Sequence, residues 1–145
     1  LWPQREDVDL LSSEDTKNKK VLGEHITSQS PNELSLVSLF TFGAFNALLT
    51  GDIEPQATNT VADNLTTPVE VLKVPHHGSK NGLTEELLGA TKPKVAIISA
   101  GQKNRFGHPH KETIKLLNDQ RIKILGTYDF GEIEVVTDGR EWSIK

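Results

Sequence analysis

The sequence has 145 residues, 35% of them hydrophobic and 25% charged, a balance that is ordinary for a globular domain with its own core. Its formal net charge of −4 argues against a general nucleic-acid coat, because phosphate binding needs a basic face, although it leaves room for a local basic patch. The chain has no cysteine, which excludes disulfide scaffolds, thiolate zinc sites and cysteine nucleophiles, so any metal must be held by His, Asp or Glu.

No stretch of the sequence approaches the ~18 apolar residues of a membrane span, and no signal-peptide pattern stands at its start. The sequence contains no methionine and begins at Leu1, so we expect it to be an internal piece of a longer protein. Residues 1–33 mix charges of both signs with Ser and Asn, which predicts a polar loop segment that can be disordered. His25 stands alone there and is interpreted as a surface residue.

Residues 34–145 form the second predicted unit, and the pattern there begins with two strands. "LSLVSLFTF" alternates and is rich in β-forming residues, Gly43 and Ala44 can turn the chain, and "FNALLT" follows as the second strand of a hairpin. Pro55 then predicts a short helix to about Leu65, because its fixed φ suits a first helical turn.

From Val69 onward, predicted strands and helices alternate. "VEVLKV" is a strand, "TEELLGAT" a helix with Thr84 as its N-cap, and "KVAIISA" a buried strand. "PHKETIKLLNDQR" is a helix with Pro109 at its first position, "IKILGT" a strand, and "GEIEVVTDGREWSIK" a hairpin in which Asp138 and Gly139 suit a two-residue turn. The order β-β-α-β-α-β-α-β-β-β implies an α/β fold with helices packed on a sheet.

Polar residues follow three of the predicted strands. Asp52 follows "FNALLTG", His76 and His77 follow "VEVLKVP", and "GQKNRFGHPH" follows "KVAIISA". Functional groups in open α/β sheets gather at the carboxyl ends of strands, so we expect the three loops to meet at one rim.

Asp52 and the adjacent histidines are the candidate metal ligands. An Asp after Gly is by itself commonly a turn or cap residue, but carboxylate and imidazole on one rim suit zinc, and also Mn or Fe. Neighbouring side chains of an extended segment point to opposite sides, so we expect either His76 or His77 to ligate and the other to pack, bind substrate or support the ligand. Ser79 and Lys80 offer donors that could cradle a phosphate.

His108 and His110 flank Pro109, and Lys103 and Arg105 precede them. Because Pro109 disfavours helical backbone at His108, that residue can sit at the mouth of the helix as a proton donor or anion ligand. The alternative is that both histidines only cap the helix. The two basic residues are either solvated charges or, beside a metal, partners of phosphate oxygens.

The segments "LLTGDIEP", "LKVPHHGSKN", "PKVAIISAGQKNRFGHPH" and "DFGEIEVVTDG" occur in this order. Together they resemble the metallo-β-lactamase-like domain of the ComEC competence proteins, polytopic DNA-uptake channels whose hydrolase domain lies at the C-terminal end. The resemblance implies an αββα sandwich and a dinuclear metal hydrolase that cuts phosphodiesters, degrading the DNA strand that is not imported. It places the chain in an extracytoplasmic domain of a bacterial inner-membrane protein, although stand-alone soluble hydrolases carry the same motifs.

The resemblance also implies roles for single residues. Asp52 matches the carboxylate that bridges two divalent metals, zinc first and manganese as an option, and one of His76 and His77 matches the last ligand. His108 and His110 would transfer protons. The substrate-binding residues would be Ser79, Lys80, Lys103 and Arg105.

The family's first half carries an HxHxDH motif and a further histidine, and this sequence contains neither. We therefore expect it to be the C-terminal half of the domain, which binds metal weakly and is inactive by itself. Its expected partners are single-stranded DNA, the missing N-terminal half and a second copy held by an uncovered sheet face. The alternatives are a metal-independent DNA-binding or self-associating module, and a metallo-hydrolase for another small ester or phosphodiester.

Overall fold

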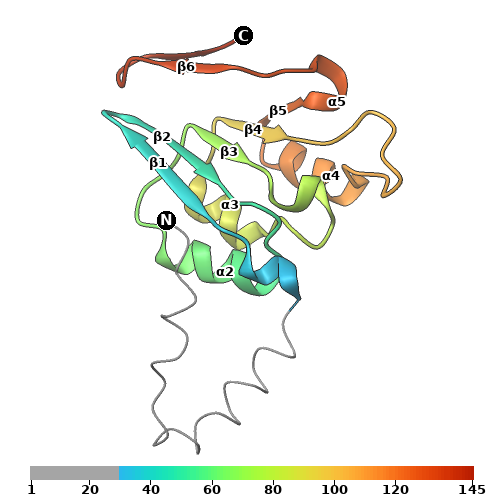
Figure 1. Cartoon of the computed structure of the whole chain (residues 1–145). Coiled ribbons are helices and arrows are strands. Elements are labelled where there is room, and N and C mark those ends of the chain that lie inside the picture. The colour runs from blue at the N-terminus through green and yellow to red at the C-terminus, as the bar shows by residue number, and fades with distance from the viewer. Residues whose placement is uncertain (1–29) are drawn as a thin grey trace, which may run out of the picture. The chain divides into compact units, whose positions relative to one another are not determined.

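The structure, a computed structural model, describes residues 30–145, and Pro31–Lys145 form one compact unit (Figure 1). The surface position predicted for His25 lies outside the described residues, and so does the predicted polar loop as far as residue 29. Where that predicted loop ends, Pro31–Leu34 form a short 3-10 helix, η2.

A five-stranded sheet lies at the centre of this unit. Its strands run in the order β1 (Ser38–Phe42), β2 (Phe45–Leu49), β3 (Val71–Lys73), β4 (Val95–Ile98) and β5 (Lys123–Gly126). β1 pairs antiparallel with β2, and the pairs from β2 to β5 are all parallel. The carboxyl ends of four strands therefore lie along the same edge.

Helices connect the parallel strands. α2 (Pro55–Asn64), α3 (Glu85–Thr91) and α4 (Lys111–Asp119) follow β2, β3 and β4 in turn, and the short α5 (Thr127–Phe130) follows β5. Because parallel crossovers are right-handed and the strands are in sequential order, successive helices cover the same face of the sheet. Figure 1 shows α2 and α3 together on one side of the strands.

The local signals for helix starts are confirmed in two places and wrong in a third. α2 has its proline in the first turn, and the Thr84 side chain accepts a hydrogen bond of 3.2 Å from the Leu87 N–H at the start of α3. α4, however, starts at Lys111 with His110 as its N-cap, so Pro109 precedes the helix. His110 stays extended because its N–H donates to the Gly78 carbonyl at 2.9 Å.

The C-terminal hairpin consists of β6 (Val135–Thr137) and β7 (Trp142–Ile144). The predicted two-residue turn is wrong, because four residues separate the paired strands. The Asp138 carboxylate accepts hydrogen bonds of 2.8 Å from the N–H groups of Arg140 and Glu141, and these bonds close the wider loop.

The two faces of the sheet carry different layers. On the helical face, the core contains the fully buried Leu48, Leu72, Leu88, Ile98 and Leu117. Because side chains alternate along a strand, the residues between them point to the opposite face, where the β6–β7 hairpin lies.

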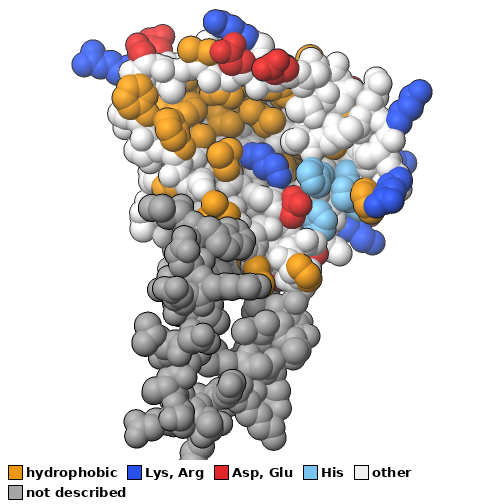
Figure 2. Space-filling model, viewed as in Figure 1, with side chains coloured by type: hydrophobic (Ala, Val, Ile, Leu, Met, Phe, Trp, Pro, Cys, Tyr) orange, Lys and Arg blue, Asp and Glu red, His pale blue; other side chains and the backbone are white. Residues whose placement is uncertain are grey.

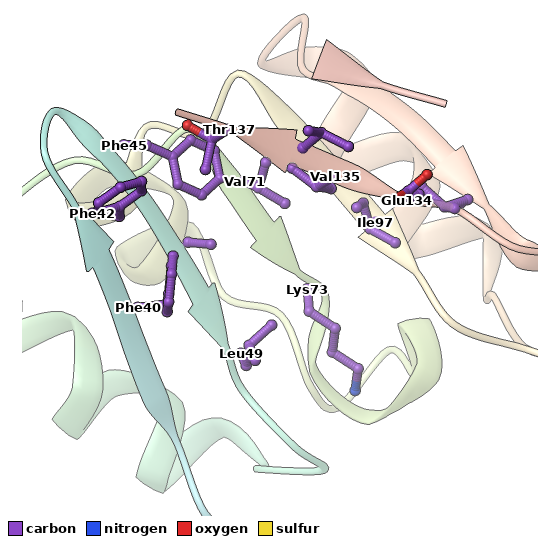
Figure 3. Close-up of a pocket in the computed structure, with 13 residues that line it drawn as sticks. Phe40, Phe42, Phe45, Leu49, Val71, Lys73, Ile97, Glu134, Val135 and Thr137 are labelled. Carbon is purple, nitrogen blue, oxygen red and sulfur yellow. The ribbon is translucent and has the colours of Figure 1, made fainter. Parts of the chain in front are cut away.

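A cavity of about 690 Å³ lies between that opposite face and β6. Figure 3 shows Val71 and Ile97 next to Val135 of β6, whereas Phe40 and Leu49 lie away from it. Phe40, Phe42 and Leu49 are each about half exposed, and Figure 2 shows apolar side chains gathered on this side of the molecule. The hairpin thus covers one part of the face and leaves the end near β1 open.

The α/β class and the predicted order of the main elements are confirmed, with η2, η3 (Pro75–Gly78) and α5 as additions. The described residues form a mixed sheet with four α-helices. None of the helices in residues 30–145 has the length and apolar character needed to cross a membrane.

Candidate functional site

The carboxyl ends of β2, β3 and β4 bring polar side chains together. We call Asp52, His76, His77, His108 and His110 the histidine rim. The His77 ring lies 3.4 Å from an Asp52 oxygen, and the His108 ring centroid lies within 6.4 Å of the centroids of the other three histidines. Figure 2 shows histidine side chains clustered together, with acidic and basic side chains next to them. The three loops meet at one edge, as predicted from the strand order.

Asp52 is placed by a tight turn after β2. Gly51 has φ +58, and a side chain there would meet Ser35 at 2.9 Å, while the Asp52 N–H donates to the Ser35 hydroxyl at 3.2 Å. Lys73 of β3 donates to the Gly51 carbonyl at 2.9 Å and lies 3.8 Å from the Asp52 carboxylate. Burial lowers the pKa of Lys73, and the nearby Asp52 charge opposes this shift.

The sequence analysis gave Lys73 no role. The signal that could have revealed it is a lysine between apolar residues of a strand, with only Val74 and Pro75 between it and the paired histidines. Among the described residues, Lys73 is the lysine or arginine that forms an ion pair with the Asp52 carboxylate.

The paired histidines are not extended, so the premise that their side chains point to opposite sides is wrong. His76 has φ 48 and His77 has φ 56, so both lie in the left-handed region within η3. The turn is held by the His76 N–H, which donates to the Gly51 carbonyl at 3.1 Å, and it brings both rings to the rim. Two successive non-glycine residues in this region are strained, which is typical of a functional site.

The His77 ring is oriented by its Nδ1 atom, the nitrogen that does not face Asp52. Nδ1 lies 2.7 Å from the Ser99 carbonyl, which can only accept, so Nδ1 carries the proton. Nε2 then faces Asp52 Oδ1 at 3.4 Å, and two acceptors at that distance repel unless a proton or a metal ion lies between them. An imidazole oriented by a backbone carbonyl is the usual arrangement of a histidine metal ligand.

His76 has a different neighbour. Its Nδ1 lies 3.7 Å from the Glu54 carboxylate and is buried without a hydrogen-bond partner among the described residues. Glu54 also accepts a hydrogen bond of 2.9 Å from the Asn32 side chain. Sequence reasoning missed Glu54, although its place two residues after Asp52 was a usable signal.

His108 lies at the centre of the ring cluster, 4.8 Å from the His110 centroid. Burial lowers the pKa of His108, and the charges of His110, His76 and His77 lower it further. His110 accepts a hydrogen bond of 3.0 Å at Nδ1 from the Lys80 N–H, so its Nε2 carries the proton. His110 thus presents a donor to the rim.

Two of the candidate substrate-binding residues follow η3. Ser79 is buried, its hydroxyl accepts from the Asn81 N–H at 3.3 Å, and its carbonyl accepts from the Thr113 hydroxyl at 3.1 Å. The Ser79 side chain is therefore engaged within the fold. Lys80 is exposed next to His110, but its N–H is already used by that ring.

The other two candidates lie on the loop after β4. Lys103 and Arg105 are both exposed, and the Arg105 guanidinium lies 4.8 Å from the centroid of the Phe106 ring. Neither residue joins the contacts between the histidines and Asp52.

The sequence was compared with curated proteins and with family models. It is 37% identical over 127 residues to ComE operon protein 3 of Bacillus subtilis, which covers 87% of this chain. The chain is similar to a segment of that protein. It is also 34% identical over 117 residues, or 80% of the chain, to Recombination protein 2 of Haemophilus influenzae. The third relative, Uncharacterized protein YcaI of Escherichia coli, is 30% identical over 115 residues, or 78% of the chain.

The aligned segment is 16% of ComE operon protein 3 and 15% of each of the other two proteins, so the chain spans about one sixth of their length. No family model matches the sequence. The predicted similarity to competence proteins is supported by ComE operon protein 3 and Recombination protein 2, whereas the metallo-β-lactamase-like character of the domain stays a prediction.

The donor set of the rim suits part of a metal site. In residues 30–145, no three His, Asp or Glu side chains are grouped so that they could hold a metal ion. Asp52 and His77 form a close pair of an oxygen and a nitrogen donor, whereas a catalytic zinc ion takes three protein ligands. Within the described residues, the rim therefore offers a pair of donors and not a complete ligand set.

Proposed function

We propose that the chain is part of a metal-dependent phosphodiesterase that acts in DNA uptake during bacterial competence. The similarity to ComE operon protein 3 and Recombination protein 2 supports the biological role. The chemistry rests on one observation: His77 Nδ1 is held by the Ser99 carbonyl while Nε2 lies 3.4 Å from Asp52. This is how a histidine and a carboxylate that share a cation are arranged.

Asp52 would bridge two divalent metals, zinc or manganese, and His77 rather than His76 would be the histidine ligand. The bound ions would supply an activated water and neutralise charge on the phosphate. The further ligands would come from a segment outside this chain, which spans only about one sixth of its relatives. The αββα sandwich would be completed by the same segment, placed on the sheet face that the helices leave open.

The other residues of the site would assist this pair. Lys73 would add a positive charge 3.8 Å from the Asp52 carboxylate, and His110 can donate its Nε2 proton to the leaving oxygen. The exposed Lys80, Lys103 and Arg105 would hold phosphates along the strand. In this proposal the domain lies on the outer side of the bacterial inner membrane, with a separate soluble hydrolase as the alternative.

For the isolated chain, we expect weak metal binding and no turnover, because two protein ligands are one short of a catalytic zinc site. The chain is incubated with zinc, dialysed and analysed for metal, and then assayed with bis-p-nitrophenyl phosphate and with single-stranded DNA. We expect much less than one equivalent of retained zinc, and less still in Asp52→Asn. A full equivalent of tightly held zinc together with turnover would contradict this expectation.

A metal-independent DNA-binding module is the second candidate, and the exposed basic loop after β4 favours it. In that case a single strand would bind equally well with and without EDTA, and its affinity would fall steeply with added salt. A requirement for metal would exclude this candidate.

We also propose that a second copy covers the open end of the apolar face when the chain is isolated. β1 lies at the edge of the described sheet, and its sequence "SLFTF" contains neither charge nor proline to prevent pairing. Antiparallel pairing of two such strands about a two-fold axis is self-complementary, and it would join the half-exposed Phe40 and Phe42 of both copies.

We expect light scattering to give a dimer whose share rises with concentration. Phe40→Lys should yield a monomer, because it places a charge in the apolar contact. Phe130→Lys is the matched control, since Phe130 is somewhat more exposed than Phe40 but lies in α5, and it should remain dimeric. A wild-type monomer at millimolar concentration would refute the proposal.

A further inference from the structure

The loop between β4 and α4 holds an aromatic ring in solvent. Phe106 follows a run of polar residues and lies beside the histidine rim, and its side chain is 62% exposed. We propose that Phe106 stacks on a nucleobase of a single DNA strand whose phosphate lies at the rim. The inference rests on the proposed function, since it names the base-binding subsite of the same substrate.

The rings between Phe106 and Asp52 are nearly parallel. The Phe106 and His108 planes differ by 22° with centroids 5.8 Å apart, and the His108 and His77 planes differ by 17° with centroids 6.4 Å apart. His77 in turn lies 3.4 Å from Asp52. A base that stacks on Phe106 would therefore continue the series of rings that leads to Asp52.

Phe106 also borders a cavity of about 190 Å³. The walls of the cavity are otherwise formed by His77, His108, Asn104 and the small residues Ala100 and Gly101. A cavity lined by flat rings and small residues suits a planar, unsaturated ligand. Stacking in such a cavity is tolerant of base identity, because every nucleobase has a π-face.

Hydrogen bonds brace the backbone of the loop on both sides of Phe106. The Asn104 side chain donates to the carbonyls of Gly101 at 2.8 Å and His108 at 2.6 Å, and it accepts from the His108 N–H at 2.8 Å. The Ala100 backbone at the start of the loop is tied to the Thr127 hydroxyl at 3.0 Å. Preorganisation of this kind lowers the ordering cost of binding.

Charge on the loop favours a nucleic acid over an apolar peptide. The Arg105 guanidinium lies 4.8 Å from the Phe106 centroid, and Lys103 is exposed two residues earlier. An aromatic ring with adjacent cations is the usual platform for single strands, whose bases are unstacked and whose backbone is anionic. In a duplex the bases lie inside the stack, so the ligand is a single strand.

The test compares two fluorescent oligonucleotides of equal length and charge, one with bases and one built entirely of abasic sites, bound to the full chain in EDTA. We expect the wild type to bind the base-bearing strand about 10-fold more tightly, the size of one stacked base. Phe106→Ala should bind both strands equally, whereas Phe106→Trp should keep the preference. Phe130→Ala, which removes a similarly exposed ring in α5, should also keep it.

Equal affinity of the wild type for the two strands would overturn the inference, as would a preference retained by Phe106→Ala or an absence of binding to either strand. Because these measurements exclude metal, they are independent of the zinc and turnover assays. Loss of base preference with intact metal-dependent chemistry would reject only the stacking subsite. A retained base preference without metal-dependent hydrolysis would reject only the proposed hydrolase activity.

Discussion

Asp52→Ala, made in the longer protein proposed to contain this chain, should reduce phosphodiester hydrolysis by more than about 100-fold. Removing groups that merely orient a ligand already costs about 10–100-fold, and Asp52 is proposed to contact the metal itself. The fold should persist, because the Asp52 side chain is 40% exposed and its ion pair with Lys73 is long, at 3.8 Å. Steady-state rates with a saturating divalent ion measure the effect.

Asp63→Ala is the matched control, since it removes an exposed carboxylate from α2, away from the strand ends. Its activity should equal that of the wild type. Thermal unfolding of both variants should differ from the wild type by less than about 1 kcal/mol in the free energy of unfolding. An Asp52→Ala enzyme with full activity would refute the bridging role.

Gly78→Ala should lower the free energy of unfolding by about 2–5 kcal/mol, the sum of a left-handed alanine and an overpacked contact. Gly78 has φ +81, and a Cβ there would lie 2.7 Å from the Pro109 Cβ and 3.2 Å from the Pro109 Cα. Because the Gly78 carbonyl also receives the His110 N–H, the substitution pushes apart the two loops that carry the histidines. Urea denaturation of the isolated chain measures the loss.

Gly89→Ala provides the matched comparison, because Gly89 is exposed within α3 and an added Cβ would meet nothing within 4 Å. Alanine is the better helix former, so this variant should gain about 0.5–1 kcal/mol. If Gly78→Ala were as stable as Gly89→Ala, the close contact between η3 and the loop before α4 would be wrong.

Much of the fold could be predicted because its signals are local. Pro55 and Thr84 mark helix starts by their own chemistry, and the continuous apolar run around Ala96 marks a buried parallel strand. Strand order then follows from short right-handed connections, and with it the meeting of three loops at one edge. For this reason Asp52 and His108 could be placed at the same rim.

The details of the site depend on contacts between distant segments, which no local pattern encodes. His76 turns into the left-handed region because its N–H is bound to the Gly51 carbonyl, 25 positions earlier in the chain. Likewise, Ser99 decides which nitrogen of His77 faces Asp52. The choice between His76 and His77 could therefore not be made from the sequence, and the proposal that His77 is the ligand rests on this packing.

Lys73 spans two regions of the molecule. Its stem lines the apolar cavity below β6, while its amine reaches the Gly51 carbonyl and the Asp52 carboxylate (Figure 3). A polypeptide that covers the open face would strip water from the Lys73 stem and so act on Asp52 without touching it. In the proposed site, assembly and ion binding would then be thermodynamically linked. Because linkage is reciprocal, an ion bound at Asp52 would also change how tightly the covering polypeptide is held.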